Sequence, residues 1–398
     1  MADLKYALVF GASGVTGWSV VSEMLHDYPR KGVWGGVVAL TNRPLSVELS
    51  QWPKDDRLAI VSGIDLLAGS QEDLERAMKA KIPHLDKITD SLYFAYKANT
   101  DQDVQLTENV EMFRRAVVAC DRLCPRLESV VLQTGAKQYG CHLLDKRPAY
   151  LVPPLAETLP RLSPPASDGL FYLPQMDFVA AYAQGKRWGW LDTRPDIIVG
   201  FVPNQNFYSI ASSLGIFLSL YRAVHGAGAA CPFPGTAKSW VAKSHDSSAE
   251  MIARQTMHVA LAPRYRGRQE GVSFNVGDGR TPCTWETRWP DICAYFGLRG
   301  VKQPADNPIE VRAFIRSHLD AWRGLETKHG LQTGHADNER IHPGFEYFLL
   351  SQFDQDREFD MRKMYDEAGF TEERDPKTAW GRVFDQMKAA KIIPSTYE

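Results

Sequence analysis

The sequence predicts an α/β fold, a doubly wound parallel sheet with a smaller, mostly helical second part. Short apolar segments with the length of buried strands alternate with longer amphipathic segments, which is typical of parallel βαβ units. The first apolar segment, residues 6–10, is followed at once by a glycine-rich turn. A chain of 398 residues, of which 44% are hydrophobic, can bury the large core that such a sheet needs.

Three glycines at regular spacing, Gly11, Gly14 and Gly17, follow the first predicted strand. The first two let the backbone turn sharply, and the third lets the next helix pack closely on the strand. The free N–H groups at the start of that helix, together with its dipole, form an anion site suited to a pyrophosphate. The pattern predicts a Rossmann-type dinucleotide site that also includes Ser13 and Val15. A tight turn that binds nothing is the alternative.

The second predicted strand, residues 34–40, ends at Thr41, Asn42 and Arg43. Sites selective for NAD usually place Asp or Glu here, because a carboxylate accepts hydrogen bonds from the ribose 2′-hydroxyl. This chain offers neutral and basic side chains instead, and Arg43 would pair with a 2′-phosphate. The sequence therefore predicts NADPH/NADP+ as the cofactor. The alternative is that Arg43 is an ordinary surface arginine.

The third predicted strand, residues 58–63, leads to Asp65. An Asp after the third strand commonly receives the adenine amino group in this fold, so Asp65 is a candidate cofactor ligand. Capping the next turn is its alternative role. We then expect a helix over residues 71–82, a strand over 87–93 and a helix over 104–120.

A further apolar strand begins at Ser129 and breaks at Thr134 and Gly135, and Lys137 follows directly. Ligands bind at the carboxyl ends of the strands in an open parallel sheet. We therefore expect these three residues to face the same crevice as the glycine turn and to contact the cofactor. Later predicted elements are strands over residues 188–192 and 196–202 and a helix over 210–224.

Short-chain dehydrogenases usually carry a tyrosine and a lysine four residues apart on one helix, where the lysine lowers the pKa of the tyrosine. Two pairs have this spacing, Tyr93 with Lys97 and Tyr182 with Lys186. The first pair lies at the end of a predicted strand. The second contains a glycine and runs directly into the next strand. The usual dyad is therefore absent.

Residues 134–139 read Thr-Gly-Ala-Lys-Gln-Tyr, and residues 170–177 read Leu-Phe-Tyr-Leu-Pro-Gln-Met-Asp. These stretches resemble the motifs Thr-Gly-x-Lys-His-Tyr and Asn-Phe-Tyr-Tyr-x-x-Glu-Asp of the progesterone 5β-reductase/iridoid synthase family of atypical short-chain dehydrogenases. The chain departs from them at Gln138, Leu170 and Leu173, which bears on the substrate more than on the chemistry. The resemblance spans almost the whole chain and continues at Arg194-Pro195, Gly200-Phe201-x-Pro203, Asn206, Phe274-Asn275-Val276-x-Asp278-Gly279, Trp285 and residues 388–394.

This resemblance implies that Tyr172 and Lys137 are the catalytic residues of an NADPH-dependent ene-reductase. Hydride addition to the β-carbon of an α,β-unsaturated carbonyl places negative charge on the carbonyl oxygen. Tyr172 would stabilise this charge as the direct hydrogen-bond donor, and Lys137 would stabilise it as a nearby cation. A buried aromatic with a satisfied hydroxyl is the alternative for Tyr172. A reductive or redox-neutral cyclase and an NADP(H)-binding regulator without catalysis are the alternative functions. A carbonyl reductase or an epimerase fits less well, because the usual dyad is missing.

The chain divides into a cofactor-binding part and a substrate-side part. We expect residues 1–205 and 234–280 to form the NADP-binding Rossmann domain, and residues 206–233 and 281–398 to form the smaller, discontinuous substrate-side region. The substrate is expected to be a small apolar carbonyl compound. Candidate pocket walls are Phe201, Asn206, Phe207, Tyr347 and Phe353.

Composition excludes several other classes of function. The net charge of −2, without a basic run interleaved with aromatics, predicts neither a nucleic-acid nor a membrane surface. The N-terminus does not resemble a signal peptide and no apolar run has the length of a membrane span, so we expect a cytoplasmic protein. The cysteines and histidines lack metal-ligand spacing, and His142 is interpreted as a polar loop residue. The oligomeric state stays open, with a homodimer as one option.

Overall fold

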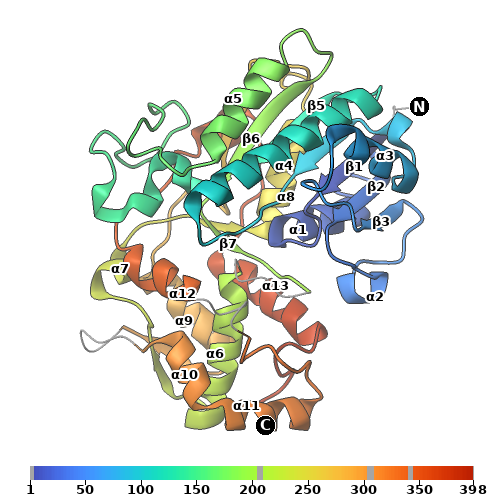
Figure 1. Ribbon diagram of the computed structural model, residues 1–398. Coiled ribbons are helices and arrows are strands. Elements are labelled where there is room, and N and C mark those ends of the chain that lie inside the picture. Colours follow the sequence, from blue (N-terminus) through green and yellow to red (C-terminus); the bar gives the residue numbers. More distant parts are fainter. Residues whose placement is uncertain (1–3, 204–208, 303–308, 339–343, 398) are drawn as a thin grey trace.

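The computed structural model describes residues 4–203, 209–302, 309–338 and 344–397. Its upper part in Figure 1 is a twisted parallel sheet between helices, and its lower part is mostly helical. The described part of the chain contains no helix that is both long enough and apolar enough to cross a membrane.

The central sheet has seven strands, all parallel, in the order β10-β6-β5-β4-β1-β2-β3. The chain starts in the middle of the sheet, builds outward to β3 and then crosses back to β4, so a topological switch point lies between β1 and β4. Ligands bind at the carboxyl ends of the strands at such a point. The predicted doubly wound fold is confirmed. In sheet order from β3 the strands are Leu58–Ser62, Trp34–Thr41, Lys5–Phe10, Asp90–Tyr93, Ser129–Gln133, Gly189–Pro195 and Val272–Val276.

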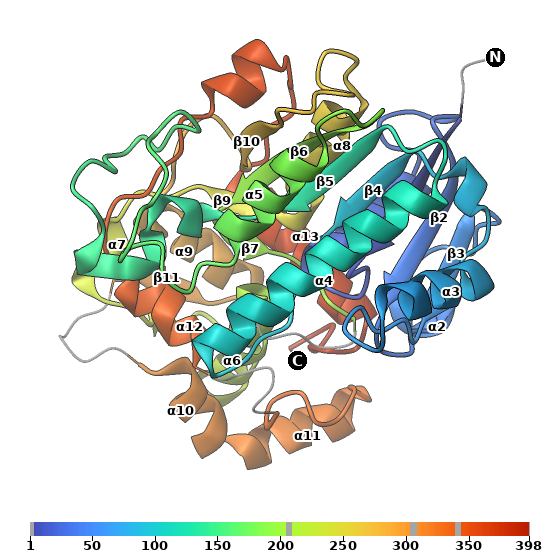
Figure 2. The ribbon, with the colours of Figure 1, turned by 45° about the horizontal axis from the view of Figure 1, so that its top comes forward.

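The apolar strands bury both of their faces under helices. Along β1, Ala7 and Val9 belong to one core cluster and Leu8 and Phe10 to another, because successive side chains of a strand point to opposite faces. The first cluster lies under α1 (Val15–Leu25) and α8 (Ala249–Leu261). The second lies under α3 (Gln71–Lys81), α4 (Gln102–Leu123) and α5 (Tyr172–Tyr182), and α4 and α5 run side by side in Figure 2.

The predicted helices over residues 71–82 and 104–120 are confirmed, and their first turns show why they begin where they do. Ser70 and Asp73 form a capping box at the start of α3. The carboxylate of Asp101 accepts the N–H groups of Asp103 and Val104 and so starts α4 two residues earlier than predicted.

The strand predicted over residues 196–202 does not join the central sheet. Instead β6 continues through Pro195, and the shorter strand β7 (Ile197–Val199) pairs with β9 (Asp246–Ser248) in a separate two-stranded sheet. Asp196 explains the change of direction. Its backbone N–H donates to the Ser247 hydroxyl at 3.0 Å, and its buried carboxylate pairs with Arg357 at 2.9 Å.

The lower part in Figure 1 packs helices around α6 (Ile210–His225). Strands β8 (Ala230–Pro232) and β11 (Arg299–Val301) form a second small sheet there. The predicted division at residues 206, 234 and 281 stays a proposal. The other helices are α2 (Val47–Ser50), α7 (Ala237–Val241), α9 (Trp285–Tyr295), α10 (Val311–Ser317), α11 (Leu319–His329), α12 (Phe345–Tyr347) and α13 (Pro376–Ala389).

A neutral histidine ties a C-terminal segment to the rest of the chain. His245 is 1% exposed, and its Nδ1 accepts the backbone N–H of Phe359 at 3.1 Å. Its ring also stacks on the Phe359 ring, with the ring centroids 5.9 Å apart. Burial lowers the pKa of His245 to about 4, and protonation of Nδ1 would remove the acceptor for Phe359.

We expect this histidine to make the protein less stable in acid. The unfolded state binds the proton near the ordinary pKa of 6.5, whereas the folded state binds it only near pH 4, so the free energy of unfolding falls as the pH falls between these values. The upper bound is roughly 3 kcal/mol. His245→Asn keeps an acceptor but cannot titrate. Urea unfolding of both proteins at several pH values should show a smaller acid-induced loss in the variant, and equal losses would contradict this assignment.

Candidate active site

The glycine turn brings strand β1, the following helix and a neighbouring loop into backbone contact. Gly11 has a φ of +74°, and a Cβ atom on it would lie 2.7 Å from the backbone N of Ala95. A Cβ atom on Gly17 would lie only 2.3 Å from the carbonyl oxygen of Gly11. Gly14 donates its N–H to that same carbonyl at 2.9 Å and is the N-cap of α1. Close approach therefore requires glycine at the first and third positions.

No side chain of the described residues caps the N–H groups at the N-terminus of α1. Gly14 supplies no capping group, and the first turn holds no acidic residue, whereas α3, α4 and α9 begin at the side-chain caps Ser70, Asp101 and Thr284. Ser13 is half-buried beside this N-terminus. Val15 is buried and packs against Gly200, where an added Cβ atom would lie 2.4 Å from Val15 Cγ2. Unclaimed N–H groups without nearby negative charge fit the pyrophosphate of a dinucleotide.

Two hydrogen bonds of Thr41 hold the turn after β2, and Arg43 is exposed there. The Thr41 hydroxyl donates to the carbonyl oxygen of Arg43 at 2.6 Å and lies 2.9 Å from the Ser62 hydroxyl. Asn42 and Arg43 are exposed. Among the described residues no group bonds the Arg43 guanidinium, so it is available to a ligand. Asp65 is also exposed, and one of its carboxylate oxygens caps the next turn by accepting the Leu67 N–H at 2.9 Å.

The turn after β5, which we call the lysine turn and which comprises residues 134–139, lies beside Tyr172. A Cβ atom on Gly135 would lie 3.7 Å from the Tyr172 hydroxyl oxygen and 3.2 Å from the carbonyl oxygen of Pro195. At the end of β5, Gln133 Nε2 donates to the Thr16 hydroxyl in the first turn of α1 at 3.1 Å. The structure therefore brings the glycine turn, the lysine turn and Tyr172 together.

Lys137 and Tyr172 both carry functional groups that the protein leaves unused. Lys137 is half-buried, and burial lowers the pKa of its ammonium. Burial raises the pKa of the Tyr172 phenol, and the neighbouring Tyr96 raises it further, so the hydroxyl stays protonated. In the part of the chain that the structure describes, neither group makes a hydrogen bond, and none joins the two residues.

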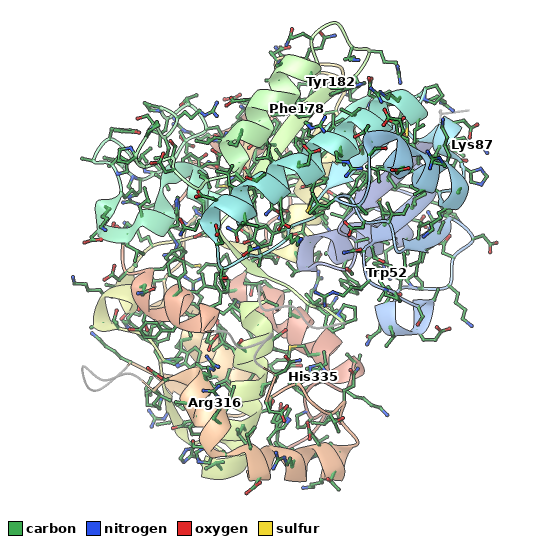
Figure 3. The ribbon with its side chains drawn as sticks, viewed as in Figure 1. Trp52, Lys87, Phe178, Tyr182, Arg316 and His335 are labelled. Atoms are coloured by element: carbon green, nitrogen blue, oxygen red, sulfur yellow. The ribbon has the colours of Figure 1, made fainter. Side chains whose placement is uncertain are left out.

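Helix α5 starts at Tyr172, but the position four residues later, where the usual dyad has its lysine, is occupied by a methionine. Four residues on is Met176, and its Sδ accepts a bond from Gln138 Nε2 in the lysine turn at 2.9 Å. At the other end of α5, Tyr182 and Lys186 both bond to the Asp121 carboxylate, at 3.0 and 2.7 Å. Tyr182 thus lies away from the lysine turn, on the outer part of the helix in Figure 3. Lys97, the second lysine with dyad spacing, pairs with Glu108 at 2.6 Å.

The predicted pocket residues lie in different environments within the structure. Phe201 is buried in the core, where it packs edge-on against Trp18 with the ring centroids 4.9 Å apart. Tyr347 is 48% exposed. Phe353 is half-buried and lines a small pocket that also includes Cys141, just beyond the lysine turn. The two other predicted walls, Asn206 and Phe207, lie outside the described residues.

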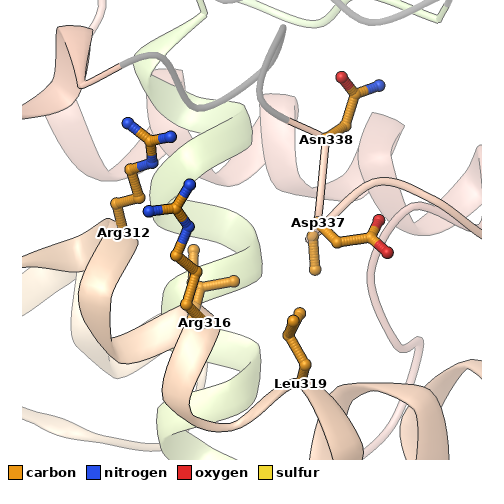
Figure 4. Close-up of a pocket in the computed structure, with 7 residues that line it drawn as sticks. Arg312, Arg316, Leu319, Asp337 and Asn338 are labelled. Carbon is orange, nitrogen blue, oxygen red and sulfur yellow. The ribbon is translucent and has the colours of Figure 1, made fainter.

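Another small pocket, of about 80 Å³, lies apart from these residues (Figure 4). It is lined by Arg312 and Arg316 of α10 and by the segment around Asp337, in the helical lower part of the molecule, where Figure 3 also places His335. Tyr172 and Lys137 do not line it, so the site is built around the three turns and not around this pocket.

Sequence reasoning missed a buried ion pair beneath the lysine turn. Asp192 and Arg194, both in β6, are joined by a bond of 2.8 Å from Arg194 Nε to Asp192 Oδ2. Arg194 belongs to a motif of the resemblance, which could have drawn attention to it. Asp192 gives only one signal in the sequence, a carboxylate at the end of the strand predicted over residues 188–192.

Comparison with known proteins agrees with this fold. A family model described as a PRISE-like Rossmann-fold domain matches residues 7–394. The chain belongs to the PRISE-like Rossmann-fold family. The short chain dehydrogenase ausT of Aspergillus calidoustus is 34% identical over 399 residues, which cover 98% of this chain and 94% of the relative. An (S)-8-oxocitronellyl enol synthase of Nepeta cataria is 27% identical over 98% of this chain and 93% of its own length.

Solved structures show the same fold at lower identity. A UDP-glucose 4-epimerase aligns with a TM-score of 0.60 at 12% identity, over 97% of this chain and 98% of the other. A short-chain dehydrogenase/reductase from Agrobacterium tumefaciens with bound NAD aligns with a TM-score of 0.56 at 15% identity, over 96% and 97%. This PRISE-like protein is thus an oxidoreductase of the short-chain dehydrogenase/reductase superfamily, and the resemblance found in its sequence is confirmed.

Proposed function

We propose that the protein is an NADPH-dependent ene-reductase that adds hydride to the conjugated C=C bond of an enone or enal. The observation that carries the proposal is the position of Tyr172, whose hydroxyl bonds to none of the described residues and lies beside Gly135 at the carboxyl end of the sheet. The printed name of one relative, an enol synthase, adds support. An enol forms when negative charge on a carbonyl oxygen is stabilised, and a phenol and an ammonium can do this.

The bound nicotinamide supplies the hydride, and the residues of the chain receive the charge that results. The Tyr172 phenol donates its hydrogen to the substrate carbonyl oxygen, because its raised pKa keeps it protonated at neutral pH. The Lys137 ammonium, which no carboxylate neutralises among the described residues, adds positive charge on the same side. The half-buried position of both groups strengthens these interactions, because less water screens them.

Product analysis with NADPH tests this function. Cyclohexenone, citral and progesterone are offered as substrates, and NADPH consumption is followed together with the identity of the product. A saturated carbonyl compound is the expected product from at least one substrate. An allylic alcohol would instead show attack on the carbonyl carbon and would overturn the proposal. Tight NADPH binding without turnover of any carbonyl compound would favour the regulator.

Arg43 should set the preference for NADPH over NADH. Arg43 is exposed, and its backbone carbonyl accepts the Thr41 hydroxyl, while charge-assisted bonds from its guanidinium to a 2′-phosphate would be worth about 1.5–3 kcal/mol. We expect Arg43→Ala to weaken NADPH binding by roughly 10- to 100-fold and to leave NADH binding unchanged. Fluorescence titration measures both. Arg76→Ala, which removes an exposed arginine from α3, is the control, and equal weakening for both dinucleotides would contradict the role of Arg43.

A further inference from the structure

The two ends of the lysine turn are anchored to the same buried ion pair. At one end, the Thr134 hydroxyl donates to Asp192 Oδ2 at 3.1 Å. At the other end, the Tyr139 hydroxyl accepts a bond from Arg194 Nη1 at 3.2 Å. Lys137 lies between these anchors. The ion pair itself belongs to β6, the strand next to β5, so the turn is fixed to the rigid sheet and not to a loop.

A second layer of bonds holds the anchors. The Tyr139 hydroxyl donates to Asn275 Oδ1 at 2.6 Å, and Arg194 Nη2 donates to the Ser273 hydroxyl at 2.8 Å. Ser273 and Asn275 lie on β10, and the Ser273 hydroxyl in turn donates to Asp192. Tyr139 is 2% exposed, and Asp192 and Asn275 are fully buried. Two neighbouring strands thus supply a closed set of partners for the turn.

A buried ion pair of this kind needs an explanation other than stability. Removing two charges from water costs about as much as their attraction returns, and apolar residues of similar size often stabilise a core as well. A buried polar network that is fully satisfied does, however, specify one arrangement of its members. Here that arrangement is the path of the lysine turn, which sets where Gly135 and Lys137 lie relative to Tyr172.

We propose that Thr134, Asp192, Arg194 and Tyr139 are positioning residues that hold the lysine turn so that Lys137 acts on the same substrate oxygen as Tyr172. None of the four needs to touch the substrate. Gln138 extends the effect, since its bond to Met176 links the turn directly to the helix that begins at Tyr172. The catalytic part of this inference rests on the proposed ene-reductase function, whereas the placement of Lys137 does not.

Two substitutions remove one anchor each without removing a charge. Tyr139→Phe deletes the hydroxyl that meets Arg194 and Asn275, and Thr134→Val deletes the hydroxyl that meets Asp192. We expect each to lower kcat for enone reduction by about 10- to 100-fold with KM within about twofold, and Tyr139→Phe to leave the NADPH affinity within about twofold, as for other residues that orient a reacting group. Thr134→Ser restores the hydroxyl and should restore kcat, which a purely packing role would not predict. If Tyr139→Phe does not fold, the comparison of Thr134→Val with Thr134→Ser tests the positioning role alone.

A second experiment follows the environment of Lys137 by NMR spectroscopy and needs neither cofactor nor turnover. Lysines are converted to isotope-labelled dimethyl-lysines, which keep their charge, and the Lys137 resonance is assigned in the NMR spectrum by its loss in Lys137→Arg. We expect this resonance to shift in Tyr139→Phe and in Thr134→Val. The control is Tyr182→Phe, which removes a tyrosine–carboxylate bond of 3.0 Å at the far end of α5 and should leave the Lys137 resonance unmoved.

The outcomes separate this inference from the proposed function. An unmoved Lys137 resonance in both variants, or an unchanged kcat, would overturn the positioning role. If no enone is reduced at all, the ene-reductase proposal fails, and the spectrum alone decides whether the buried ion pair sets the position of Lys137. A resonance that moves equally in Tyr182→Phe would also overturn the inference, because it would then report a general loosening of the protein.

Discussion

Replacing Tyr172 by phenylalanine should lower kcat for enone reduction by about 100- to 1,000-fold, the usual cost of one donor to a developing oxyanion. The hydroxyl makes no hydrogen bond within the described residues, so the protein loses no structural contact with it. The ring contact with Phe171, with centroids 4.7 Å apart, is retained. We therefore expect the melting temperature and the NADPH affinity to stay unchanged, as measured by thermal denaturation and fluorescence titration.

The matched control for this variant is Tyr182→Phe on the same helix. Tyr182 donates to the Asp121 carboxylate, so its loss should reduce stability slightly and leave kcat intact. The two variants are thus expected to behave oppositely: Tyr172→Phe should lose activity and keep its stability, whereas Tyr182→Phe should lose some stability and keep its activity. Full activity in Tyr172→Phe would remove Tyr172 from the chemistry and leave Lys137 as the main candidate donor.

The overall fold could be predicted from the sequence because its signals are local. A strand such as β1 is buried on both faces and therefore reads as a continuous apolar run, and Gly11 and Gly17 mark the turn that follows it. The strand predicted over residues 196–202 is shorter than predicted and lies outside the central sheet. Its direction depends on Asp196 meeting Ser247 and Arg357, partners that are distant in the chain and carry no local pattern.

The candidate site, like the fold, could be predicted only where its residues lie in local sequence motifs. Lys137 and Tyr172 could be proposed because each lies in a recognisable motif, and in the structure Gly135 of one motif lies beside Tyr172 of the other. Asp192 could not be found, because one carboxylate in a strand does not reveal that Thr134 and Arg194 will surround it. The walls of a substrate pocket are harder still, since an aromatic side chain such as Phe201 serves equally well in a core.

A large structural effect is expected for Gly17→Ala. The new Cβ atom would lie 2.3 Å from the carbonyl oxygen of Gly11 and 2.9 Å from the Cα atom of Ala12, so helix α1 would have to move away from β1. Backbone atoms cannot yield as a flexible side chain would, and overpacking of this kind costs roughly 3 kcal/mol. Urea unfolding should show this loss in the free energy of unfolding.

The same displacement should also damage the cofactor site, because the N–H groups of α1 are the proposed contacts for the pyrophosphate. Losing one charge-assisted bond to the pyrophosphate would weaken binding of both NADPH and NADH by roughly 10- to 100-fold. The control is Gly324→Ala in helix α11, where nothing lies within 4 Å of an added Cβ atom and alanine should stabilise the helix by about 0.5–1 kcal/mol. Unchanged dinucleotide affinity in Gly17→Ala would show that the start of α1 is not the pyrophosphate site, since the steric conflict there leaves the helix no other way to respond than to move.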